Sequence, residues 1–172
     1  MILCLSLSIQ NRLDTLPILD VTITTTGSGV NGVFATGQGS TLVNPSGMLL
    51  KASAGDWGTG GSNGAAVTFA ADSEALHGNV VCDSISTVSI TLNNSITLEG
   101  SINAEHTAKS ITVTVDKTSV WEVPGDSYLT SLTDGDTTLA NIHANGHTGY
   151  YDASNSANDW LNGMIYDLPG GW

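Results

Sequence analysis

Short runs in which apolar and polar residues alternate recur along the chain and predict β-strands. No stretch keeps apolar residues at the i, i+3, i+4 and i+7 spacing of an amphipathic helix, and β-branched residues dominate the runs. Pairs rich in Gly, Asn and Asp separate the runs and indicate tight turns. We expect an all-β protein with strands at residues 21–24, 66–69, 80–81, 88–92, 111–115 and 139–142.

Similar passages return about every 22 residues, a period typical of stacked repeats. Leu76-His77-Gly78 and Leu98-Glu99-Gly100 each lead into an alternating run, and Trp121 opens a third passage. One such unit cannot bury its apolar side alone, whereas stacked units can. We therefore predict a parallel β-helix (β-solenoid) of about seven or eight coils. A β-sandwich also uses many short strands and is the structural alternative.

The chain divides into three parts within one domain. Residues 1–20 are an apolar N-terminal segment, either a truncated coil or a weak signal-like stretch that lacks a basic start. Residues 21–152 carry the coils, and the aromatic-rich residues 153–172 are the expected C-terminal cap. An uncapped solenoid end exposes unpaired backbone groups, so self-association through open ends is one expectation.

The composition favours an extracellular or cell-surface protein. Only 12% of residues are charged, so Ser, Thr, Asn and Gly must provide most of the hydrated surface. Four Lys and Arg face sixteen Asp and Glu, for a net charge of -12, which excludes nucleic acid as a partner and disfavours anionic membranes. The N-terminal apolar run is too short to span a bilayer as a helix, so we expect no membrane insertion.

Several stretches are similar to passages of secreted right-handed β-helix proteins of the adhesin-like and autotransporter-passenger-like kind. They are residues 24–35, 121–132, 145–147 together with 150–152, and 158–163. The resemblance implies a right-handed coil. Because the architecture is clear and no convincing catalytic site accompanies it, we expect a non-catalytic structural or adhesive role, with a glycan, another cell-surface component or a second copy as partner. The resemblance supplies no catalytic residue, because this group hosts adhesins and polysaccharide enzymes alike.

A secreted hydrolase, either an esterase or a polysaccharide-degrading enzyme, is the functional alternative. Ser62 lies in a formal G-x-S-x-G motif, but no helix is expected after it, as a nucleophile elbow requires. A glycosidase needs two facing carboxylates, although aspartates in turns commonly cap their own loops. The candidate bases are His77, His106, His143 and His147, and the candidate acids are Asp126, Asp134, Asp136 and Asp152.

Cofactor signals are weak. Asp134-Gly135-Asp136 is a fragment of a calcium loop without its remaining ligands, so we expect no cofactor, with weak calcium binding at Asp134 and Asp136 as the alternative. The i, i+4 spacing of His143 and His147 would suit zinc on a helix, but the Asn145-Gly146 turn between them argues against one. Cys4 and Cys82 have no metal-binding or redox spacing, and their pairing stays open.

Overall fold

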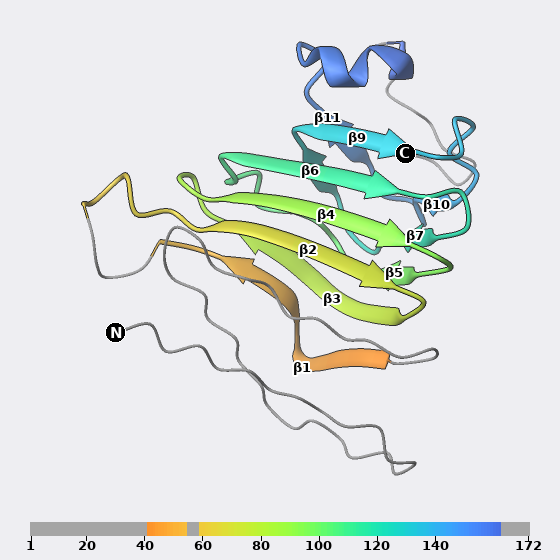
Figure 1. The fold of residues 1–172 in the computed structure, drawn as a ribbon, viewed down its shortest axis with the longest axis horizontal. Coiled ribbons are helices and arrows are strands. Elements are labelled where there is room, and N and C mark those ends of the chain that lie inside the picture. Colours follow the sequence, from red (N-terminus) through yellow and green to blue (C-terminus); the bar gives the residue numbers. More distant parts are fainter. Residues whose placement is uncertain (1–40, 55–58, 163–172) are drawn as a thin grey trace.

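The computed structural model describes residues 41–54 and 59–162, which form a parallel β-solenoid of about four turns (Figure 1). Sheet A contains β1 (Thr41–Ala52), β3 (Ala75–Cys82), β5 (Thr97–Glu99), β7 (Val120–Glu122) and β10 (Ile142–His143), in that order. Sheet B contains β2 (Ala66–Asp72), β4 (Thr87–Asn93), β6 (Ser110–Val115) and β9 (Ser131–Asp134). Sheet C pairs β8 (Ser127–Leu129) with β11 (Gly149–Tyr151), and the 3-10 helix η1 (Ser156–Leu161) follows.

Every pair of described strands is parallel, and each strand pairs with strands one coil away. Leu76 lies beside Leu98, and Trp121 lies beside both Leu98 and Ile142. The predicted repeat is therefore confirmed, and the sandwich alternative is wrong because it would need antiparallel pairing between consecutive strands.

Two predictions need correction. The column has about four turns over the described residues, not seven or eight. The expected number assumed that every residue lies in a coil of about 22 residues, whereas β1 ends at Ala52 and β2 begins only at Ala66. The strand expected at 139–142 is reduced to Ile142–His143, because Leu139 adopts a left-handed backbone with φ of 55° in the preceding turn. The predictions for residues 1–40 and 163–172 lie outside the described residues.

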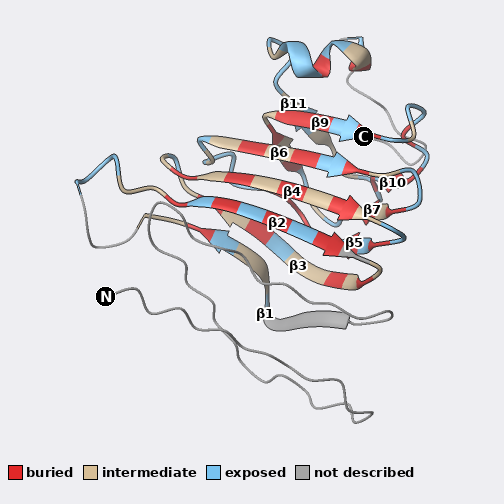
Figure 2. Cartoon of the chain, in the orientation of Figure 1, coloured by how far each residue is buried: buried red, intermediate tan, exposed pale blue. Residues whose placement is uncertain are grey.

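The core is a set of inward ladders, seen in Figure 2 as buried positions that alternate along β2, β4 and β6. Trp121 is fully buried, and its indole Nε1 donates to the carbonyl oxygen of Gly100 at 2.9 Å. In sheet B, Phe69, Ile90, Val113 and Leu132 form one ladder from coil to coil. Each inward residue therefore packs on its equivalents in neighbouring coils.

The helix η1 lies over the end of the column and contacts β9 (Figure 1). The buried side chain of Asn158 accepts a hydrogen bond from Leu132 N at 3.0 Å, and Trp160 Nε1 donates to Leu132 O at 2.9 Å. These bonds satisfy backbone groups on a strand that has no further strand beside it.

Candidate functional site

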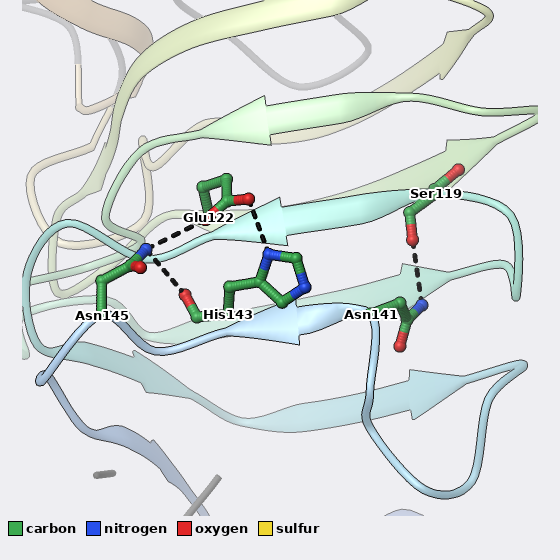
Figure 3. Close-up of polar contacts among 5 residues, drawn as sticks. All are labelled: Ser119, Glu122, Asn141, His143 and Asn145. Carbon is green, nitrogen blue, oxygen red and sulfur yellow. Dashed lines mark hydrogen bonds and ion pairs between the residues drawn. The ribbon is translucent and has the colours of Figure 1, made fainter. Parts of the chain in front are cut away.

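One column of ionisable side chains runs up the outer surface of sheet A. The strand register places His77, Glu99, Glu122 and His143 at equivalent positions of successive coils. His77 Nδ1 lies 3.0 Å from Glu99 Oε2, and His143 Nδ1 lies 2.6 Å from Glu122 Oε1 (Figure 3). All four side chains are partly exposed, so each pair is a solvated link between neighbouring coils.

Glu122 is the most engaged carboxylate of this column. Asn145 Nδ2 donates to its Oε2 at 3.0 Å (Figure 3). Hydrogen bonds from Asn145 and from His143 lower the pKa of Glu122. Glu122 is therefore suited to remain an ionised carboxylate and not to serve as the protonated general acid that glycoside hydrolysis requires beside its second, ionised carboxylate.

Asp126 and His147 form a third link between coils, on the side of sheet C. His147 Nδ1 lies 3.7 Å from Asp126 Oδ1, and the same oxygen accepts from Thr148 N at 2.9 Å. His143 and His147 thus face different carboxylates. Across residues 41–54 and 59–162, no three His, Cys, Asp or Glu side chains gather as a metal site.

The outer surface of sheet C carries a stack of three aromatic rings, which we call the aromatic column. His106 stacks on Tyr128 with 4.4 Å between ring centroids, and Tyr128 stacks on Tyr150 with 4.6 Å between centroids. Tyr150 is 40% exposed and is the exposed large hydrophobic side chain of the described part of the chain. The ring faces inside the stack are covered by the neighbouring rings. The ring edges, the two tyrosine hydroxyls and the outer ring face of Tyr150 remain for contact with a ligand.

The turn aspartates cap their own loops. Asp136 Oδ1 accepts from the N–H and hydroxyl of Thr138, and Asp152 Oδ1 accepts likewise from Ser154. These hydrogen bonds lower the pKa of both aspartates. Asp134 points inward and is buried, so the structure does not make Asp134 and Asp136 a common ligand set.

Ser62 lies in an exposed turn, closed by a hydrogen bond from its backbone N–H to Thr59 O at 2.9 Å. Strand β2 follows it, not a helix. His77, His143 and His147 contact carboxylates, and His106 stacks on Tyr128. The described residues therefore contain no Ser–His pair at Ser62 of the kind that an esterase uses.

An open depression of about 260 Å³ lies beside Cys82 and Asp83. Burial is the main cause that raises the pKa of the free Cys82 thiol, to about 11. Asp83 accepts backbone hydrogen bonds from Ala54 and Ile85. The depression thus offers a neutral thiol and a carboxylate already engaged in backbone contacts, without a nucleophile–base pair.

Glu99, Glu122 and Asn145 were not predicted as site residues from the sequence, and neither was the ring stack of Tyr128 and Tyr150. The repeat itself held the signal, because alignment of Leu76-His77-Gly78 with Leu98-Glu99-Gly100 already places His77 opposite Glu99.

Comparison of the chain with protein-family models, with curated proteins and with solved structures finds no match. In the described part of the chain, no helix has the length and apolar character needed to span a membrane.

Proposed function

We propose that this protein is a non-catalytic structural or adhesive β-solenoid that binds a neutral, extended glycan at the cell surface or outside the cell. The aromatic column carries the proposal. Its exposed end, Tyr150, offers an open ring face, and the hydroxyls of Tyr128 and Tyr150 lie in neighbouring coils on the same side. Aromatic rings with a polar tip supply apolar contact and a hydrogen bond together, as sugar recognition demands.

The charges around the column favour a neutral glycan. Asp126, Asp152 and Glu105 are exposed near its rings in the sequence, and the whole chain carries a net charge of -12. A polyanionic polysaccharide would be repelled. A right-handed coil is part of the proposal, because connections between parallel strands are right-handed in about 98% of cases.

The non-catalytic part of the proposal is supported by how the candidate catalytic groups are used. His77, His143 and His147 each contact a carboxylate of a neighbouring coil. Asp136 and Asp152 cap turns. A catalytic site would instead bring such groups together around one position for the reacting atom.

Retention on insoluble polysaccharides tests the proposal. We expect the protein to be depleted from solution by microcrystalline cellulose or chitin and to remain in solution with beads of crosslinked carboxymethyl cellulose, a polyanionic polymer. Tyr150→Ala should weaken retention by about tenfold, the equivalent of one aromatic contact. His77→Ala is the matched control, because it truncates an exposed ring on sheet A, and it should bind like the parent protein. Equal retention of parent and Tyr150→Ala, or no retention on either neutral polymer, would refute the proposal.

A further inference from the structure

A buried carboxyl and a buried amide face each other where the last coil turns from sheet B to sheet A. Asp134 ends β9 at an inward position and is 7% exposed, and Asn141 precedes β10 and is 9% exposed. In the strand register, Asp134 lies directly above Val115, so a carboxyl continues a column of aliphatic side chains. An acid at such a position needs a specific partner.

The hydrogen bonds fix how the two side chains are oriented. Asn141 Nδ2 donates to Asp134 Oδ1 at 3.1 Å, to Ser119 O at 3.0 Å (Figure 3) and to Asp116 O at 3.2 Å. Because three acceptors surround this nitrogen, the amide cannot be turned over without placing its oxygen against carbonyl oxygens. Asp134 Oδ1 also accepts from Asp136 N at 2.8 Å.

The second oxygen of each side chain is buried and accepts no hydrogen bond within the described part of the chain. These atoms are Asp134 Oδ2 and Asn141 Oδ1. An ionised carboxylate and an amide oxygen can only accept, so neither can satisfy the other. A protonated carboxyl can, because its O–H donates to the amide oxygen while its other oxygen accepts from the amide N–H.

We propose that Asp134 is held in its protonated form in the folded column, with the proton on Oδ2 donated to Asn141 Oδ1, so that this acid–amide pair closes the last coil and loosens when it ionises. The proposal is independent of glycan binding.

The carboxylates around Asp134 act in the same direction, whereas the ammonium of Lys117 opposes them. The charged groups on the elements around Asp134 are Asp116 and Lys117 in the turn below, Asp136 in its own turn and Asp159 on η1. Burial is the main cause that raises the pKa of Asp134, and the carboxylates of Asp136 and Asp116 raise it further. Since the folded pKa lies above the unfolded value of 3.8, the stabilisation is complete below pH 3.8 and is lost as pH rises through the folded pKa.

Thermal unfolding of Asp134→Asn against pH tests the proposal. Asn mimics the protonated carboxyl at every pH, so its unfolding midpoint should match the parent protein at pH 3 and exceed it by about 4 °C at pH 8. Asp136→Asn makes the same change at a turn cap two residues away, and it should give no increase in the unfolding midpoint at pH 8. A midpoint of Asp134→Asn at or below that of the parent protein at pH 8 would overturn the proposal.

A second measurement keeps the proposal testable if Asp134→Asn does not fold. In the parent protein, the side-chain carboxyl carbon of Asp134 should titrate by NMR above the other aspartates. A pKa of Asp134 at or below the unfolded value of 3.8 would refute the acid–amide pair. A midpoint that rises with millimolar CaCl2 in the parent protein but not in Asp134→Asn would also refute it, because a cation would then occupy the place of the proton.

Discussion

Replacement of Gly100 by Ala tests the close packing of consecutive coils most directly. A Cβ at this position would lie 2.1 Å from the carbonyl oxygen of Gly78 in the coil below, and Cβ contacts below 3.0 Å essentially do not occur. The obstacle is backbone, which cannot rotate away as a side chain can. The two coils must therefore separate locally by about 1 Å in an interior that is otherwise close-packed.

The cost follows from the hydrogen bonds that this separation breaks. Ser101 N donates to Asn79 Oδ1 and Val80 N donates to Ser101 O, both at 2.9 Å, across the same two coils. Gly100 O also accepts from the buried indole of Trp121. At about 1 kcal/mol net for each bond, we expect a loss of roughly 3 kcal/mol. Such a loss is a large share of the 5–15 kcal/mol typical of a whole domain.

Urea unfolding followed by tryptophan fluorescence measures this loss. Gly125→Ala is the matched control, because its Cβ would lie 3.5 Å from the Cβ of Ser101, an ordinary contact. We expect Gly125→Ala to stay within about 1 kcal/mol of the parent protein. If Gly100→Ala were equally mild, the reasoning about coil spacing would be wrong.

Three further predictions concern the core, a corner and the thiol. Trp121→Phe should lower the unfolding free energy by about 2 kcal/mol in the same urea assay, because it leaves Gly100 O buried without its donor. Asp116→Ala should cost about 1 kcal/mol at pH 7, the worth of a lost cap. Burial opposes ionisation of Asp116, but hydrogen bonds from Asn94, Ser119 and Thr118 outweigh it and lower the pKa to about 2, so the difference from the parent protein should be complete above pH 3.8 and vanish as pH falls through 2. Cys82 should resist Ellman's reagent at pH 8 in the folded protein and react once urea unfolds it, whereas rapid labelling of the native thiol would contradict its burial.

Strands β2, β4 and β6 of sheet B were predictable because one face of each is buried and the other faces solvent, whereas the shorter β9 was not predicted. Val88 and Ile90 are inward while Ser89 and Thr91 are not, and this alternation is visible in the sequence. Strand β1 was not predicted, because Pro45 and Gly47 break its pattern. The structure tolerates them through register shifts between Val43 and Met48 in its pairing with β3.

Contacts on the outer surface were harder to predict than the core. Exposed positions carry no periodic apolar signal, so only the exact register identifies partners such as Glu122 and His143. That register drifts, since coil-to-coil hydrogen bonds join residues 19 apart at Ile111 and 25 apart at Asn103. The inward carboxyl of Asp134 was likewise hidden, because a turn-like Asp-Gly-Asp sequence gives no sign of which side chain is buried.

Pairing that reaches only to the adjacent coil makes the length of this protein an adjustable property. In the described part of the chain, each strand inside sheets A and B contacts the strand one repeat before it and the strand one repeat after it, and the strands at the two ends of each sheet have one such neighbour. A tandem duplication of residues 76–97 would therefore give the new copy the same kind of neighbours as the original. Genes for such columns can gain or lose whole repeats by recombination, and the column can change its height without redesign of its interior.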